Sequence, residues 1–202
     1  MSPLGLTLAV SDAVSEIDPP VRIATMEIRR ATSLPKKDIS GRDFTFEISA
    51  EVVKPYDALM RDETIVTNPV PTVKKDFGFD ESEFENIKDH DAALFTVVED
   101  EMVYGYIHAT RSWNNMVEIR WIVLDVSIRG HGYGKLLLDE VLKWARQLGV
   151  AGVRLESQSN NIAACRFYKR YGFKFGGYDE YLYRGIAQNK QETAFFWYYM
   201  LE

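Results

Sequence analysis

The 202-residue sequence contains few of the residues that build disulfide frameworks and metal centres, with one cysteine and three histidines. The single cysteine, Cys165, cannot form an intramolecular disulfide and is typical of a reducing compartment. The scattered histidines offer no Cys/His ligand spacing for zinc. The sequence therefore predicts neither a disulfide scaffold nor a metal site.

Two further features are missing: an excess of positive charge and a long apolar run. The 24 basic and 30 acidic residues give a formal net charge of −6, whereas a nucleic-acid-binding domain is normally basic. No uninterrupted apolar segment approaches the roughly 18 residues that a membrane-spanning helix needs. The apolar stretch at 4–10 lacks a basic segment before it and is followed by acidic residues, unlike a secretion signal. We expect a cytoplasmic protein with no nucleic-acid or membrane partner.

The length of the chain and its apolar fraction of 46% favour one globular domain with a full core. Residues 1–25 show no sustained periodicity and contain the Pro19-Pro20 pair, so we expect a loose N-terminal extension before a domain over 26–202. Strand patterns dominate the first half of the chain, and strands alternate with helices in the second half. This order predicts a mixed α/β domain around a central sheet.

Segments with the apolar content or alternation of strands occur at 27–30, 44–48, 94–98, 103–108, 117–126, 153–156, 179–183 and 193–201. Apolar residues recur at helical spacing between residue 135 and Gly149, and a second helix is expected over 161–171. Ser159 or Asn160 is the expected N-cap of that second helix. Residues 54–91 give no clear pattern because three prolines interrupt them.

A glycine-rich turn, RGHGYGK over 129–135, joins the strand at 117–126 to the following helix. Glycines have no Cβ atom, so the backbone amides of such a turn can face a ligand. The unpaired amides and the dipole of the helix N-terminus favour an anion, and Arg129 and Lys135 add positive charge. The turn therefore predicts a phosphate or pyrophosphate site. Its spacing fits neither the P-loop nor the dinucleotide-binding pattern.

The turn does fit R-x-x-G-x-G, through Arg129, Gly132 and Gly134, and a second pattern, N-x-x-A-x-x-x-Y followed by Gly-Phe, begins at Asn161. In this order and separation the two motifs resemble the GNAT family of acetyl-CoA-dependent N-acetyltransferases, over roughly 28–202. The resemblance implies an α/β (α+β) fold, with a mixed central β-sheet flanked by helices. It also implies acetyl-CoA as a co-substrate, in the cleft where the fourth and fifth strands separate.

The resemblance further implies where acetyl-CoA would bind. Pantetheine would pair with the end of the fourth strand, and the pyrophosphate would contact the glycine-rich turn. The implied cofactor-binding residues are Leu124, Asp125, Val126, Arg129, Gly130, His131, Gly132, Tyr133, Gly134, Lys135, Asn161 and Tyr168. The family contains monomers and dimers, so a homodimer stays open.

N-acetyl transfer needs a neutral amine and a proton donor for the leaving thiolate. The resemblance implies that Tyr168 is the donor. Glu118 and Glu156 lie in otherwise apolar strand segments beside the expected cleft, so both are candidates for the general base. Either glutamate could instead hold a substrate ammonium or pair with an arginine. Cys165 is expected to be buried filler.

The residues around the second motif, and an acidic segment over 76–91, resemble the streptothricin (nourseothricin) acetyltransferases of that family. Members acetylate an amine of streptothricin-type antibiotics and so confer resistance, which implies a small cationic amine as substrate. Segment 76–91, with seven acidic residues and one lysine, would attract a polycation, unless it is only a solvated loop. Tyr178, Tyr181 and Trp197 are candidates for an aromatic wall.

Several alternatives stay open at this point. The amine could belong to a polyamine, to another aminoglycoside-like compound or to a protein lysine. A domain that binds acyl-CoA without turnover is a further alternative. Phenylalanines interrupt the acidic segment, and the N-terminal part of the chain is longer than in the streptothricin acetyltransferases, so these departures concern the substrate rather than the chemistry.

Overall fold

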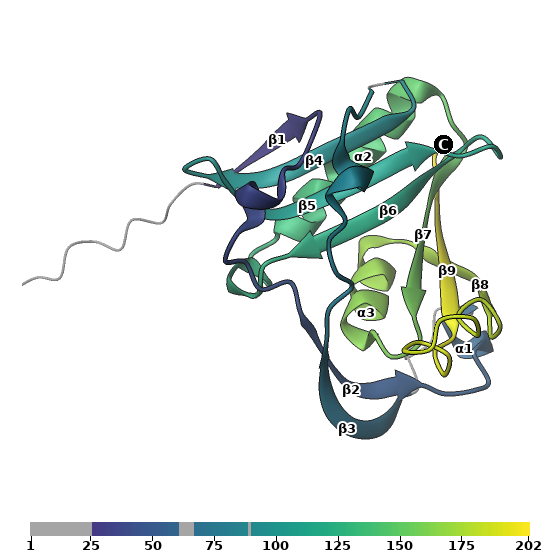
Figure 1. Ribbon diagram of the computed structural model, residues 1–202. Coiled ribbons are helices and arrows are strands. Elements are labelled where there is room, and N and C mark those ends of the chain that lie inside the picture. Colours follow the sequence, from purple (N-terminus) through teal and green to yellow (C-terminus); the bar gives the residue numbers. More distant parts are fainter. Residues whose placement is uncertain (1–25, 61–66, 89) are drawn as a thin grey trace, which may run out of the picture.

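The computed structural model describes residues 26–60, 67–88 and 90–202, so the expected extension over 1–25 lies outside the described residues. A seven-stranded sheet in the order β1-β4-β5-β6-β7-β9-β8 forms the centre, and β2 and β3 form a separate two-stranded arm (Figure 1). The strands are β1 (Glu27–Ala31), β2 (Phe46–Val52), β3 (Thr67–Lys75), β4 (Ala92–Glu99), β5 (Met102–Arg111), β6 (Met116–Leu124), β7 (Gly152–Gln158), β8 (Lys174–Asp179) and β9 (Ala194–Met200). The α-helices are α1 (Asp57–Met60), α2 (Tyr133–Leu148) and α3 (Ile162–Tyr171), and short 3-10 helices are η1 (Lys36–Ile39), η2 (Glu81–Phe84) and η3 (Val126–Ile128).

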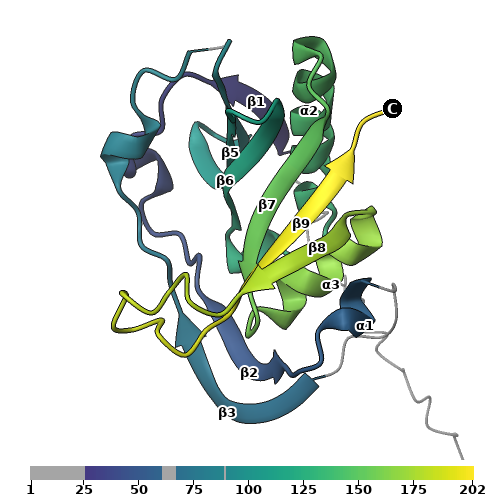
Figure 2. The ribbon, with the colours of Figure 1, turned by 90° about the vertical axis from the view of Figure 1, so that its right-hand side faces the viewer.

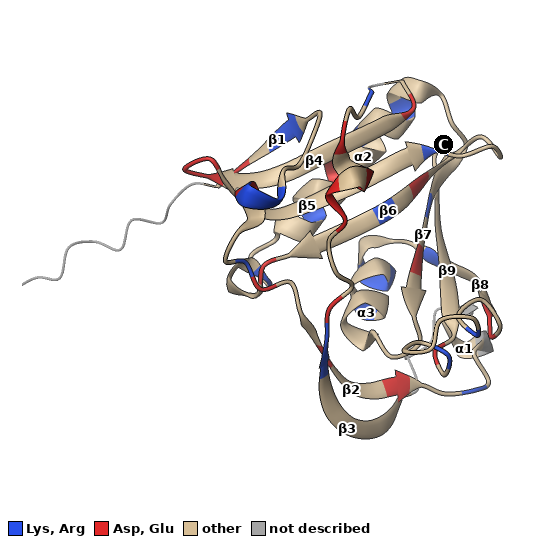
Figure 3. Cartoon of the chain, viewed as in Figure 1, with Lys and Arg blue, Asp and Glu red and all other residues tan. Residues whose placement is uncertain are grey.

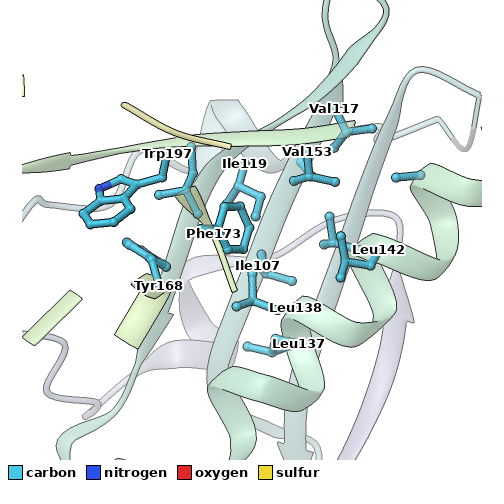
Figure 4. Close-up of a cluster of buried hydrophobic side chains, with 14 of the residues drawn as sticks. Ile107, Val117, Ile119, Leu137, Leu138, Leu142, Val153, Tyr168, Phe173 and Trp197 are labelled. Carbon is cyan, nitrogen blue, oxygen red and sulfur yellow. The ribbon is translucent and has the colours of Figure 1, made fainter. Parts of the chain in front are cut away.

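The two longer helices, α2 and α3, lie on one face of the sheet (Figure 2). The apolar stripe of α2 packs on the inward side chains of β4 to β7 and forms most of the main core (Figure 4). Gly149 ends α2 in the left-handed conformation, with its amide bonded to the carbonyl groups of the last turn, as expected from the sequence. Among the helices of the described ranges, none has both the length and the apolar content needed to cross a bilayer.

The N-cap of α3 differs from the sequence prediction. Asn161 is the cap, and its side-chain oxygen accepts a hydrogen bond from the amide of Ala164 at 3.2 Å. Ser159, which directly follows β7, has another role: its hydroxyl accepts a hydrogen bond from the amide of Thr193, just before β9. The prediction of Ser159 or Asn160 was therefore wrong by one residue or two.

The strand expected at 179–183 was also wrong. Strand β8 ends at Asp179, where the expected strand begins, because the Asp179 carboxylate accepts from the amides of Tyr181 and Leu182 and closes a turn. The chain then runs through turns over 180–193 before β9. Conversely, strand β3 is present in the structure but was not predicted from the sequence, because it contains two prolines. Prolines are tolerated in an edge strand such as this one.

The acidic segment 76–91 covers the face of the sheet opposite α2 and does not stand free in solvent. Phe84 and Ile87 are buried in a second core cluster with Leu34 and Tyr106. Backbone hydrogen bonds join the amide of Leu34 to the carbonyl of Phe84, and the amide of Ile87 to the carbonyl of Thr32. The phenylalanines that interrupt the acidic run therefore include the anchor that holds it on the sheet.

We predict that Phe84→Ala lowers the free energy of unfolding by about 3 to 5 kcal/mol, since it removes a fully buried ring. The exposed neighbour Glu85 provides the control, and Glu85→Ala should change stability by less than about 0.5 kcal/mol. Urea denaturation of both variants measures the difference. Equal stability losses would contradict the anchoring of segment 76–91.

Candidate active site

Strands β6 and β7 separate soon after they meet. They pair in parallel only from Met116 to Ile119 on β6 and from Gly152 to Leu155 on β7. On the other edge of β6, His108 and Ala109 face Trp121 and Ile119, so Arg120 is an extra residue in a β-bulge. A bulge bends its strand and ends regular pairing. Beyond Arg120 the two strands therefore leave a gap in the sheet.

A pocket of about 330 Å³ occupies this gap. Its lining comes from the open strand ends, from α3 on one face of the sheet and from the segment that follows β3 on the other. The residues are Phe77, Glu118, Ile119, Arg120, Trp121, Ile122, Val123, Leu155, Glu156, Ser157, Gln158, Asn161, Ala164 and Tyr168. The three expected catalytic residues, Glu118, Glu156 and Tyr168, thus line one pocket.

Glu118 lies at the closed end of the gap and is held by arginines. Its carboxylate accepts from the Arg154 guanidinium at 2.7 Å, and Arg120 lies 3.7 Å from its other oxygen. All three side chains keep partial exposure. Of the roles left open by the sequence, pairing with an arginine is the one that this geometry favours for Glu118.

Glu156 lies further along the gap and has a different environment. Its side chain reaches solvent through the pocket, but the protein around it raises its pKa by desolvation, and the nearby Glu118 acts in the same direction. The buried Tyr183 donates its hydroxyl hydrogen to Oε1 of Glu156. A carboxylate with a raised pKa beside a pocket is suited to proton transfer near neutral pH. Tyr183 was missed because the sequence placed it in a strand.

Tyr168 projects from α3 toward Phe173 and Trp197 (Figure 4). Its side chain is 5% exposed, and burial raises its pKa, so the phenol stays protonated at neutral pH. Burial likewise raises the pKa of the Cys165 thiol to about 11, which leaves it a weak nucleophile. Cys165 is therefore packed in the core as expected.

None of the three residues expected to form an aromatic wall lines this pocket. Trp197 is fully buried, and its indole nitrogen donates to the hydroxyl of Ser157 at 2.9 Å. Tyr178 and Tyr181 are exposed, but neither lines the pocket. Aromatic content alone cannot distinguish a core ring from a surface ring. The rings that line the pocket in their place belong to Phe77 and Trp121.

The glycine-rich turn leads from the end of β6 into α2. Gly130 and Gly132 have φ angles of 81° and 90°, which L side chains rarely adopt. A Cβ atom on Gly134 would lie 3.1 Å from the Phe167 ring, so this glycine lets α2 pack closely on α3. His131 and Lys135 are exposed at the turn, and Tyr133 is half-buried. Gly132 is the N-cap of α2 and gives the first turn no side-chain hydrogen bond. The N-terminus of a helix is suited to an anion, which is the role that the sequence predicts for this turn.

Other expected binding residues have structural partners. The Arg129 guanidinium donates twice to the carbonyl of Leu124, at 2.9 and 2.8 Å. The Asp125 carboxylate accepts from the amides of Ser127 and Asp43, and although burial opposes this, the hydrogen bonds lower its pKa. Val126 donates its amide to the carbonyl of Asp43. The side chains of Asp125 and Arg129 therefore hold the backbone between the end of β6 and the turn.

Within the described ranges, no group of three or more His, Cys, Asp or Glu side chains could hold a metal ion.

Comparison with known proteins defines the class. Residues 56–173 match the model of the acetyltransferase (GNAT) family, and the chain belongs to that family. A streptothricin acetyltransferase of Escherichia coli is 32% identical over 80% of each chain, and streptothricin acetyltransferase A of Bacillus subtilis is 27% identical over 85% of this chain and 98% of its own.

Solved structures agree with this class. A Bacillus anthracis protein assigned as a streptothricin acetyltransferase, solved with acetyl coenzyme A, superimposes with a TM-score of 0.74 at 26% identity, covering 88% of this chain and 99% of its own. A nourseothricin acetyltransferase superimposes with a TM-score of 0.69 at 27% identity, covering 87% and 99%. The fold expected from the two motifs is confirmed.

The turns over 180–193, which carry Tyr183, are fastened to the β2–β3 arm by ion pairs. Lys75 on β3 donates to both carboxylate oxygens of Glu192, at 2.5 and 2.7 Å, and both side chains are mostly buried. Lys54, just after β2, forms a more exposed ion pair with Glu180 at the other end of the segment. The segment that carries Tyr183 is thus held by residues more than 100 positions away in the sequence.

We predict that Lys75→Met lowers the free energy of unfolding by up to about 3 kcal/mol, because the mostly buried Glu192 carboxylate loses its partner. The adjacent Lys74 is exposed and gives a matched control, for which Lys74→Met should change stability by less than about 0.5 kcal/mol. Thermal and urea denaturation measure both variants. An unchanged stability of Lys75→Met would contradict the fastening of this segment.

Proposed function

We propose that the chain is an acetyl-CoA-dependent N-acetyltransferase that acetylates a primary amine of a streptothricin-type antibiotic and so confers resistance. The named relatives support this acceptor, and they are matched over most of their length. The acetyl-CoA complex of the Bacillus anthracis relative supports the donor.

One observation carries the proposal: the pocket between β6 and β7 is lined from both faces of the sheet. Tyr168, Ala164 and Asn161 reach it from the face that carries α2 and the glycine-rich turn. Glu156 and Phe77 lie toward the face that segment 76–91 covers. A thioester and an amine can therefore approach the gap from opposite sides, which avoids competition for one binding surface.

On the donor side, the turn over 129–135 would hold the pyrophosphate through backbone amides and the α2 dipole. Pantetheine would run along the open edge of β6 to its last residue, Leu124, and on past Asp125 and Val126. Asn161 uses its side-chain oxygen to cap α3, so its amide nitrogen keeps two donors for the cofactor. These assignments extend the family resemblance residue by residue.

On the acceptor side, Glu156 is the better candidate for the base. Glu118 pairs with Arg154 through one oxygen and lies 3.7 Å from Arg120 through the other, so both of its oxygens already have a partner. Glu156 keeps an oxygen for the substrate and has a raised pKa, caused chiefly by desolvation. It can accept the proton that an ammonium must lose before attack, directly or through a water.

Two residues, Glu156 and Tyr168, carry out the proton transfers of the reaction. The amine nitrogen attacks the thioester carbonyl, an amide C–N bond forms, and the C–S bond breaks. The proton that Glu156 takes from the ammonium before attack passes to solvent. Glu156 then receives the second proton, which the nitrogen loses as the amide forms, and Tyr168 supplies one to the leaving thiolate. Proton transfer between the two residues through solvent restores both for the next turnover.

Charge supports a cationic acceptor. Acidic residues recur along the described part of segment 76–91 (Figure 3). Glu83 in this segment accepts a hydrogen bond from the indole of Trp121 on β6 at 2.6 Å. This places a carboxylate next to a ring of the pocket lining. With a net charge of −6, the surface would attract a polycationic antibiotic and raise its encounter rate.

The acceptor is tested by thiol release from acetyl-CoA with streptothricin, and with spermidine and an aminoglycoside as comparison amines. The proposal predicts rapid release with streptothricin and slow release with the other two. Faster thiol release with another amine would contradict a streptothricin-type acceptor but would still support acetyl transfer to an amine. Binding of acetyl-CoA without release from any amine would contradict the enzyme itself.

The cofactor turn is tested by Gly132→Glu, which adds a Cβ at φ 90° and a carboxylate where phosphate should bind. We expect the affinity for acetyl-CoA, measured by calorimetry, to fall by more than about tenfold. Gly149→Glu places the same side chain on a left-handed glycine at the other end of α2 and should leave the affinity unchanged. Equal affinities of the two variants would remove the turn from the cofactor site.

The proton donor is tested by Tyr168→Phe. Loss of the phenol should lower kcat by about a hundredfold, with little change in the affinity for acetyl-CoA. Tyr198→Phe removes a hydroxyl from β9 without touching the pocket lining and serves as the control. Wild-type turnover by Tyr168→Phe would exclude this residue from the reaction.

A further inference from the structure

A chain of side-chain hydrogen bonds joins Gln158 and Glu156, both on β7, through a residue that lies outside the strands of the gap. Tyr183, on the turns between β8 and β9, donates to Oε1 of Glu156. Its oxygen in turn accepts from the side-chain amide of Gln158 at 3.0 Å. The tyrosine is 7% exposed, although its neighbours Leu182 and Arg184 are exposed. Within this exposed turn segment, the Tyr183 side chain alone of these three points inward, and its hydroxyl contacts the Glu156 carboxylate.

We propose that Tyr183 is a positioning residue, which holds the Glu156 carboxylate in the orientation that accepts the proton of the acceptor amine. This inference rests on the proposed function, in which Glu156 is the base. A carboxylate has two oxygens, so the bond from Tyr183 to Oε1 leaves Oε2 to face the substrate. Without that bond, the Glu156 side chain could rotate among several rotamers, and few of them would reach the amine.

The direction of donation is fixed by electrostatics. Burial, and then the adjacent Glu156 carboxylate, raise the pKa of Tyr183, so its hydroxyl is protonated and can donate at neutral pH. Gln158 can only donate to the phenol oxygen through its amide nitrogen. The chain from Gln158 to Tyr183 to Glu156 is therefore polarised toward the carboxylate, and such chains strengthen their members.

Five influences set the protonation of Glu156. Desolvation raises its pKa most, and Glu118 on β6 acts in the same direction. The Tyr183 hydrogen bond lowers it, and so do the charges of Arg120 on β6 and Arg154 on β7. Tyr183 is thus the hydrogen-bonding partner that opposes the effect of burial on the pKa of Glu156. Loss of its hydroxyl should leave the carboxylate protonated to higher pH.

The segment that carries Tyr183 is held by the Lys75–Glu192 and Lys54–Glu180 ion pairs at its two ends. None of the four residues lines the pocket itself, and the Lys75 ammonium lies over the ring of the lining residue Phe77, 5.2 Å from its centroid. The phenol is therefore fixed by contacts that do not depend on bound substrate. This is what a positioning residue requires, since it must hold the base before the amine arrives.

The test is Tyr183→Phe, which keeps the ring and removes the hydroxyl, with Tyr198→Phe as the matched control on β9. We expect kcat at neutral pH to fall about tenfold with little change in KM for the amine, as for loss of one hydrogen bond to a charged group. The acidic limb of the pH–kcat profile should move to higher pH in Tyr183→Phe and stay in place in Tyr198→Phe. A uniform loss of kcat at all pH values would indicate a merely structural role and overturn the proposal.

A second readout does not depend on turnover. The carboxyl carbon of Glu156 is titrated by NMR in labelled protein and assigned by its absence in Glu156→Gln. The proposal requires its titration midpoint to rise in Tyr183→Phe relative to wild type. An unchanged midpoint would overturn it even if kcat falls. If wild type released no thiol with any amine, the proposed function would fail, and the NMR midpoint would still decide whether Tyr183 controls Glu156.

Discussion

The separation of β6 from β7 after four residues of parallel pairing is the constraint on which the rest of the site depends. The bulge at Arg120 turns β6 away, and Gly105 on β5 allows the diverging strand to approach, since a Cβ there would lie 2.5 Å from the Leu124 side chain. Backbone groups that would have paired across the gap are left for a ligand. The glycine-rich turn follows shortly after the end of the same strand, so the proposed thioester and phosphate sites are both positioned by β6.

Alternation along the strands assigns the chemistry to the two faces. Arg154, Glu156 and Gln158 project to one side of β7, while Val153 and Leu155 enter the core on the other. The open gap lets this polar row meet groups from the helical face. A sheet that paired to its end would keep the carboxylates and the phenol on opposite sides of a closed layer.

Local patterns predicted the parts that local forces determine. Helix α2, its stop at Gly149 and the β4–β5 hairpin could be predicted because apolar spacing and turn residues specify them within a few positions. Strand β3 could not, since its prolines are tolerated only on an edge that tertiary pairing with β2 creates. The same holds for Tyr183, whose contact with Glu156 spans 27 residues, and for Trp197, whose burial depends on strand order.

The central claim is that thioester and amine meet in the gap from opposite faces of the sheet. A crystal structure with coenzyme A and the acceptor amine tests it most directly, through the distances from the Tyr168 hydroxyl to the sulfur and from Glu156 to the amine nitrogen. The account predicts the sulfur between β6 and β7, within hydrogen-bonding reach of Tyr168, and the amine on the Glu156 side. A sulfur outside the gap, or an amine entering from the same face as the cofactor, would contradict it.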